Sequence, residues 1–390
     1  MEKIQDHINL GVAFSLNRRY QDAIREFQKA LELNPKDAEV HFQLGILYSN
    51  VGEYDRAVAS YLQVIAANSM HVNAHCKLGL IYANTGKTEE AISEFRKALE
   101  INAEDSGLHN NLGDAYYKQG SWEEARREYE ASLRINPNLS EVHFKLGYIH
   151  ESQGRYAEGV AEYEAALKIN PKHAGVFNII GGLKTKMGRL GEAENAFRQA
   201  LELNPDDAVS LQNLGQLLVR GNKPQDALAF IQRALKINPK NLDAFTLLGQ
   251  VYALLGKKNE AVAAYKKVLE MNPADANLHK ILAFIYDQQD RAVDALKEYE
   301  AALKLNATDV AVQLGLANLL YRQGEYAKAM SAFKAVIKLE PHLAEAYLKL
   351  GNIFYRQNEH DKALKVWEKA LELDPQNEIL RNNLKFVKGG

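Results

Sequence analysis

A proline that returns at fixed intervals is the feature that most constrains this chain. Every interval between successive members of the series is 34 residues or a multiple of 34, and the members are Pro35, Pro137, Pro171, Pro205, Pro239, Pro273, Pro341 and Pro375. A fixed period of this size is typical of an array in which each short structural unit packs only on its neighbours. We therefore expect a repeat array and not a protein with one central core.

Counting back from the proline as position 32 divides residues 4–377 into eleven repeats without insertion or deletion. The repeats start at Ile4, Ala38, Val72, Ser106, Ser140, Ala174, Ala208, Leu242, Ala276, Val310 and Ala344. Ser69, Ala103 and Ala307 stand where three repeats lack the proline.

Within one repeat the residue pattern predicts two helices. Positions 3, 7, 10 and 11 form one stripe at helical spacing. Positions 8 and 20 are almost always Gly and Ala, small enough to let two helices approach closely, and position 24 is nearly always aromatic. Glycine at position 15, as in Gly52 or Gly120, predicts a left-handed end to the first helix. The proline ends the second helix because it has no N–H to donate.

These residues resemble the tetratricopeptide repeat (TPR), whose pattern is Leu-Gly-x-x-Tyr, then Gly, then Ala-x-x-x-Phe/Tyr-x-x-Ala, then Pro. The fourth repeat, with HNNLGDAYYKQGSWEEARREYEASLRINP, is close to that form. The resemblance implies an all-α fold, a right-handed α-solenoid superhelix with first helices on its concave face. Residues 378–388 continue the pattern as a polar C-terminal capping helix.

Composition narrows the classes of partner. The formal net charge is −2, so no strongly basic surface favours nucleic acid. A single cysteine, Cys76, excludes an intramolecular disulfide. The start of the chain lacks the apolar run of a secretory signal, and no stretch has the length of a membrane helix. We expect a soluble cytoplasmic protein that does not insert into membranes.

The sequence gives no sign of a catalytic centre, and we expect no cofactor and no enzyme activity from the chain itself. Thr85-Gly86-Lys87-Thr88 lacks the first glycine of a phosphate-binding loop and fits a turn between helices. Histidine recurs at position 4, in His7, His41, His75, His109 and His143. Neighbouring repeats should hold these rings about 8–10 Å apart, too far to share one metal, so we interpret them as packing residues.

The expected concave face, positions 2, 5, 6, 9, 12 and 13, is the candidate partner-binding surface. In the first three repeats this face is apolar, with predicted contact residues at Ile8, Val12, Phe42, Ile46 and Leu80. Three polar residues beside them are also predicted contacts, namely Asn9, Gln43 and Lys77. The middle repeats are polar and basic, with candidates at Asn111, Lys118, Lys145, Asn213 and Arg220. The last two repeats carry the same set twice, Asn318, Tyr321, Arg322 and Asn352, Tyr355, Arg356. Ordinary TPR residues would also account for that last set, and an uncovered array end would account for the apolar groove.

Two TPR subtypes can be compared with these positions. The carboxylate clamp of chaperone adaptors finds only a partial match in Gln43, Asn73 and Lys77, so a chaperone tail is not the expected ligand. The asparagine ladder of the O-GlcNAc transferase superhelix is represented only by Asn9, Asn111 and Asn213. Binding of an extended peptide through its backbone is therefore kept as an alternative, although the asparagine ladder is sparse.

We therefore predict a non-catalytic scaffold or adaptor that binds a peptide or helical segment of a partner protein. One alternative is a self-assembling adaptor, a homo-oligomer in which the apolar amino-terminal groove receives another copy. The other is the substrate-recognition part of an enzyme whose catalytic domain lies on another chain or segment.

Overall fold

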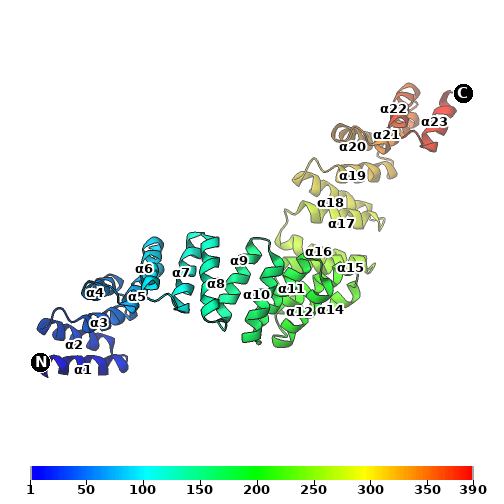
Figure 1. Cartoon of the computed structure of the whole chain (residues 1–390). Coiled ribbons are helices and arrows are strands. Elements are labelled where there is room, and N and C mark those ends of the chain that lie inside the picture. Colours follow the sequence, from blue (N-terminus) through cyan, green and yellow to red (C-terminus); the bar gives the residue numbers. More distant parts are fainter. Residues whose placement is uncertain (1, 389–390) are drawn as a thin grey trace. The chain divides into compact units, whose positions relative to one another are not determined.

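The computed structural model describes residues 2–388, and they form helices joined by short loops, with no strand in that range (Figure 1). The first twelve helices are α1 Glu2–Leu16, α2 Tyr20–Leu33, α3 Ala38–Asn50, α4 Tyr54–Ala67, α5 Val72–Asn84, α6 Thr88–Ile101, α7 Ser106–Gln119, α8 Trp122–Ile135, α9 Ser140–Ser152, α10 Tyr156–Ile169, α11 Ala174–Lys186 and α12 Leu190–Leu203. The others are α13 Ala208–Arg220, α14 Pro224–Ile237, α15 Leu242–Leu254, α16 Lys258–Met271, α17 Ala276–Asp287, α18 Ala292–Leu305, α19 Val310–Arg322, α20 Tyr326–Leu339, α21 Ala344–Arg356, α22 His360–Leu373 and α23 Glu378–Lys388. The prediction of an all-α fold of tandem helix pairs is confirmed.

Side chains in the loops define where many first helices begin. Asp37 accepts a hydrogen bond from the Val40 N–H, and Asp309 accepts one from the Val312 N–H. A carboxylate at this position satisfies an amide that has no partner inside the helix. His71 uses its ring nitrogen in the same way, accepting from the Ala74 N–H.

The first helices end in the left-handed backbone conformation that glycine at position 15 predicts. Seven glycines, from Gly52 to Gly324, have φ between 73° and 85°. Arg18, Asn222, Asp290 and Asn358 occupy the same position in the other repeats and also have positive φ. The turn is therefore kept where the glycine is lost.

The core of each helix pair is built around the small residue at position 8. A Cβ placed on Gly45 would lie 2.6 Å from the ring of Tyr61, and one placed on Gly113 would lie 2.6 Å from the ring of Tyr129. Both rings are buried, and position 20 supplies fully buried alanines such as Ala57. The large ring at position 24 therefore occupies the space that a side chain at position 8 would need.

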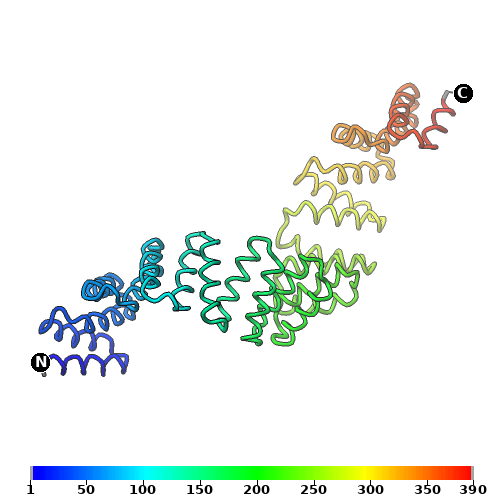
Figure 2. Tube along the Cα trace, viewed as in Figure 1, coloured from blue at the N-terminus to red at the C-terminus, as the bar shows by residue number. Residues whose placement is uncertain are grey.

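The helices group into two compact parts, residues 1–205 and residues 206–390, which we call the amino-terminal part and the carboxy-terminal part. Within each part the chain turns back after every helix, so neighbours along the sequence are neighbours in space (Figure 2). The candidate residues all lie on odd-numbered helices, where some are exposed and others are half-buried.

Candidate binding site

A cavity of about 740 Å³ lies on the carboxy-terminal part, where α21, α22 and α23 meet. Four predicted residues line it, namely Tyr321, Asn352, Tyr355 and Arg356. The remaining lining residues are Asn358, His360, Trp367, Ile379, Asn383, Phe386 and Val387. We call it the carboxy-terminal cavity.

Aromatic rings gather around Tyr355. Its ring centroid lies 5.0 Å from that of His360, 5.7 Å from that of Trp367 and 6.5 Å from that of Phe386. Trp367 is buried, whereas the Phe386 side chain is 73% exposed. The cavity therefore has a fixed aromatic floor and one ring, on α23, open to solvent.

Polar groups of the cavity have a defined orientation. The indole Nε1 of Trp367 donates a hydrogen bond of 3.1 Å to Asn352 Oδ1, and Asn383 Nδ2 lies 3.4 Å from the same oxygen. Because an indole N–H can only donate, the atom that faces it must be the amide oxygen. The two N–H groups of Asn352 are therefore directed away from Trp367.

Arg356 gives the cavity a positive charge. Its guanidinium lies 5.5 Å from the centre of the Tyr326 ring. Among residues 2–388, no carboxylate forms an ion pair with Arg356, and no Asp or Glu is among the residues that line the cavity. The combination of rings, an amide and one cation suits a segment with an apolar anchor and an acidic neighbour.

Two predicted residues of the carboxy-terminal part have their polar groups engaged outside the cavity. Asn318 Nδ2 donates to Glu345 Oε1 at 3.1 Å, and Arg322 forms an ion pair with Asp287. Asn213 is half-buried on α13 and Arg220 is exposed at the end of that helix. None of these four lines the cavity.

The predicted apolar residues of the amino-terminal part are mostly integrated into the core. Ile8, Phe42 and Ile46 are half-buried against one core cluster, and Leu80 is half-buried against the next. Phe42 contacts the rings of Tyr61 and His71, with centroids 5.7 Å and 5.0 Å away. The fifth apolar candidate, Val12, is 42% exposed.

The predicted polar residues of the amino-terminal part mostly contact other groups of the chain. Asn9 Oδ1 accepts a hydrogen bond from Gln5, and Gln43 donates to Glu39. Asn111 Nδ2 lies 4.0 Å from Cys76 Sγ, and Lys118 donates to the Ala83 carbonyl at 3.4 Å. Lys77 is exposed.

Lys145 has the richest set of partners among the predicted residues. Its Nζ lies 2.8 Å from Asp114 Oδ1, 3.0 Å from Glu141 Oε1 and 3.0 Å from Asn110 Oδ1. It also lies 5.6 Å from the centre of the Tyr129 ring. The charge of Lys145 is thus more than balanced by the two carboxylates.

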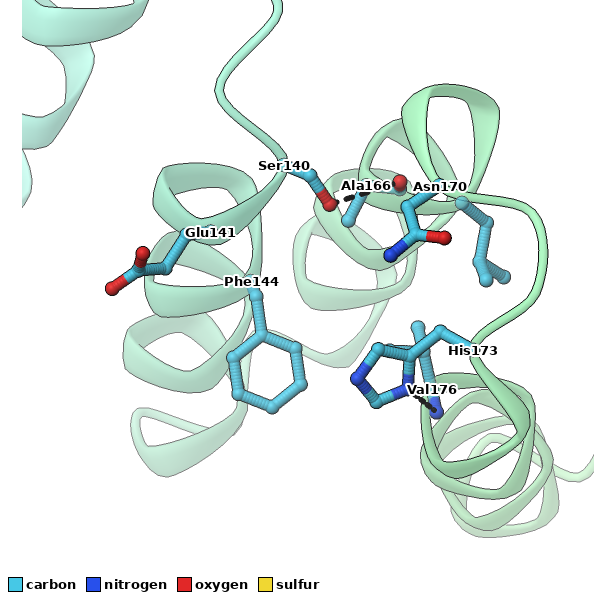
Figure 3. A pocket seen from close by; sticks show the side chains of 8 residues that line it. Ser140, Glu141, Phe144, Ala166, Asn170, His173 and Val176 are labelled. Carbon is cyan, nitrogen blue, oxygen red and sulfur yellow. Dashed lines mark hydrogen bonds between the residues drawn. The ribbon is translucent and has the colours of Figure 1, made fainter.

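Two smaller cavities flank Phe144 on α9, and the sequence interpretation missed the aromatic residues around them. One, of about 280 Å³, is lined by Tyr117 and Tyr148 together with Asp114, Tyr129, Phe144 and Lys145. The other, of about 320 Å³, lies beyond Phe144, whose ring faces that of His173 at a centroid distance of 6.3 Å (Figure 3). Positions 5, 9 and 12 of the repeats hold Phe144, Tyr148 and Tyr117, so the repeat numbering could have found them.

The residues of α23 that line the carboxy-terminal cavity were also missed. Ile379, Asn383 and Phe386 hold positions 2, 6 and 9 if the count of 34 continues into this helix. Leu380 and Leu384 are buried and fix the helix on its neighbour. The sequence predicts a polar cap at residues 378–388, yet two exposed residues of this helix, Ile379 and Phe386, are large and apolar.

The histidines at position 4 contact carboxylates. Five of them place Nδ1 2.5 to 2.7 Å from a glutamate of the following helix, in the pairs His7–Glu26, His75–Glu94, His109–Glu128, His143–Glu162 and His279–Glu298. No group of three or more His, Cys, Asp or Glu side chains that could hold a metal occurs among residues 2–388. None of the helices described is long and apolar enough to cross a membrane.

Family models cover most of the chain. The model described as the C-terminal domain of cilia and flagella-associated protein 70 matches residues 63–279. Models of the tetratricopeptide repeat match residues 5–37, 26–59, 286–335 and 314–378. The comparison with curated proteins found no match.

Several solved structures are similar to the chain. YrrB, described as a TPR protein with an unusual peptide-binding site, is 26% identical with a TM-score of 0.45, covering 49% of this chain and 99% of that one. MamA is 23% identical with a TM-score of 0.42, covering 44% of this chain and 93% of that one. Yeast Tom70 is 17% identical with a TM-score of 0.38, covering 100% of this chain and 95% of that one.

The family matches agree with the helix pairs, the glycine turns and the facing ring of each repeat. The chain therefore belongs to the tetratricopeptide repeat proteins, and over residues 63–279 to the family whose model describes the C-terminal domain of cilia and flagella-associated protein 70.

Proposed function

We propose that this TPR protein is a non-catalytic scaffold, and that its carboxy-terminal cavity binds a segment of a partner protein. The observation that carries the proposal is the cavity of about 740 Å³ that α21, α22 and α23 enclose around the Tyr355 ring. A concave site that combines aromatic side chains with oriented polar groups is a common form of a binding pocket.

The lining residues indicate which chemistry the bound segment carries. An aromatic or large aliphatic side chain would pack against the Tyr355 and Phe386 rings, which contact each other with centroids 6.5 Å apart. The amide of Asn352 would donate to a backbone carbonyl of the segment. An Asp or Glu beside the anchor would pair with Arg356, which lacks a carboxylate partner among the described residues.

A phage-displayed library of random peptides, selected on the whole chain, tests the proposal. We expect the selected peptides to share an aromatic or large aliphatic residue next to an acidic one. Phe386→Ser should weaken their binding roughly tenfold, which is about 1.4 kcal/mol and within the range of an interface anchor. Because Phe386 is largely exposed, this substitution should leave the fold intact.

Val293→Ser is the matched control, because Val293 is an exposed apolar residue of α18 that does not line the cavity. Equal binding to the wild type, to Phe386→Ser and to the control would exclude the carboxy-terminal cavity as the site.

Self-association is a second candidate function, and one observation favours it. Leu10 holds position 7 of the first repeat and is 47% exposed, whereas Leu44 and Leu78 at the same position are buried. A selected peptide consensus that matches this chain's own sequence would support self-association in place of a separate partner.

A further inference from the structure

We propose that the amino-terminal part has a second recognition site, in which Tyr117 and Tyr148 bind the side chain of an arginine from a partner protein. The site lies on α7 and α9 and is independent of the carboxy-terminal cavity. It differs from that cavity in charge, so the two sites would select opposite ligand chemistry.

The two tyrosines form the walls of a small open corner. Their ring centroids are 6.0 Å apart and their planes meet at 60°, beside the cavity of about 280 Å³. Trp122, at the start of α8, packs its ring at 90° against Tyr117, with a centroid distance of 4.9 Å. The Tyr148 side chain is 45% exposed, so a ligand can reach it from solvent.

Tyr117 and Tyr148 contact each other edge to face, and the Tyr148 ring is the one that a ligand can reach from solvent. A cation that lies within about 6 Å of such a ring is attracted to it, and arginine uses this interaction more often than lysine. A guanidinium can also stack flat on a tyrosine while its N–H groups donate at the edge. The cavity beside these two rings, with the exposed Tyr148 as one wall, therefore fits an arginine side chain.

The charges around the corner favour a cation. Asp114 and Glu141 both contact Lys145, which leaves two carboxylates against one ammonium. The Glu141 side chain is 79% exposed, so it is accessible to a second cation. An uncharged apolar ligand would gain nothing from this surplus of negative charge.

The cavity beside Tyr117 and Tyr148 already contains one cation of the chain, the Lys145 ammonium group. This group contacts the Asp114 carboxylate and lies 5.6 Å from the centre of the Tyr129 ring. The chain thus combines a carboxylate and an aromatic face around its own ammonium group. A ligand arginine would lie against Tyr117 and Tyr148 in the way that Lys145 lies against Tyr129.

The charge of the carboxy-terminal cavity provides the contrast within the same molecule. Both sites are aromatic, but that cavity is lined by Arg356 and by no carboxylate, whereas this corner is lined by Asp114 and by Lys145, which also pairs with Glu141. Fluorine NMR of the whole chain labelled with 5-fluorotryptophan can separate the two sites. The chain has two tryptophans, Trp122 beside the corner and Trp367 in the cavity.

The probe is N-acetyl-arginine methylamide, titrated into the labelled chain at low salt. We expect a saturable shift of the Trp122 resonance and no shift of the Trp367 resonance. The neutral N-acetyl-norleucine methylamide should give no saturable shift. Tyr148→Leu keeps an apolar side chain but removes the ring face, and it should weaken arginine binding about fivefold.

Tyr148→Phe, which keeps a ring, should bind arginine as the wild type does. Tyr54→Leu is the matched control, because Tyr54 is an exposed tyrosine on α4. Equal shifts with norleucine would show an apolar pocket and overturn the proposal. Unchanged arginine binding in Tyr148→Leu, or a shift with N-acetyl-glutamate methylamide in place of arginine, would overturn it as well.

Discussion

At the scale of single residues, His150 on α9 is held in an unfavourable setting for a charged ring. Its Nδ1 is buried and has no hydrogen-bond partner among residues 2–388. Burial lowers the pKa of His150, and Arg155 lowers it further, against the opposing effect of Glu162 and Glu158. The folded chain therefore favours the neutral imidazole.

This lowered pKa predicts a loss of stability in mild acid. As pH falls through the ordinary histidine pKa of about 6.5, the unfolded chain takes up a proton at His150 before the folded chain does. The free energy of unfolding should then fall with pH until the lower folded pKa is reached. Urea unfolding of the 5-fluorotryptophan-labelled chain, followed by the Trp122 resonance, measures this free energy at several pH values.

His150→Tyr is the comparison variant, because tyrosine holds the same position in repeats such as that of Tyr116. Its unfolding should depend less on pH between about 7.5 and about 5.5, on either side of the ordinary histidine value. An identical pH dependence in both proteins would contradict the prediction.

The histidines at position 4 show what the sequence could have revealed about single residues. Every repeat with histidine there has glutamate at position 23, except the second repeat, where His41 is matched by Ser60. The structure explains the pairing, since His75 contacts Glu94 with one ring nitrogen and the Ser69 carbonyl with the other. Comparing positions across repeats would have predicted these pairs, whereas considering position 4 alone suggested only a packing ring.

At the scale of helices, replacing either of two adjacent glycines of α11 by alanine should have opposite effects on stability. A Cβ on Gly181 would lie 2.6 Å from the Phe197 ring, while a Cβ on Gly182 meets nothing within 4 Å. Gly181→Ala should therefore destabilise the α11–α12 pair by about 1–3 kcal/mol through overpacking. Gly182→Ala should stabilise it by about 0.5–1 kcal/mol, because alanine loses less backbone entropy in a helix.

Native-state hydrogen exchange of the α11 and α12 amides measures both effects on the same helix pair. Ala283 and Ala317 hold the position of Gly181 in two other repeats, opposite Tyr299 and Phe333. The helix itself therefore accepts alanine there, and the measured cost reports how far the Phe197 ring can shift. If both substitutions changed the stability of the α11–α12 pair in the same direction, the space over Gly181 would not decide that stability.

The helices could be predicted from the period, but the candidate site only in part. Tyr355 and Asn352 were found because their repeat matches the family pattern closely. The polar residues of α23 predict a cap and give no sign of a contact residue at Phe386, although Phe386 holds the same position in the repeat as Asn352. The Phe386 ring is exposed because no other helix described packs over it, and residue types alone do not determine that packing.

At the scale of the whole molecule, a repeat array should divide without losing its fold. Each repeat gains stability mainly from the helices next to it, so distant repeats contribute little to one another. The chain groups into compact parts at residues 1–205 and 206–390. We therefore predict that a cut between Pro205 and Asp206 yields two fragments that are each folded.

Circular dichroism and urea unfolding of the separate fragments test this prediction. The two spectra should add to that of the intact chain, and each fragment should unfold cooperatively. The arginine probe should bind the fragment of residues 1–205, which holds Tyr117 and Tyr148, and the library peptides should bind the fragment that holds Tyr355. A fragment that is unfolded alone would show that its helices depend on the rest of the chain. Binding that needs both fragments would place the ligand on a surface that neither part provides by itself.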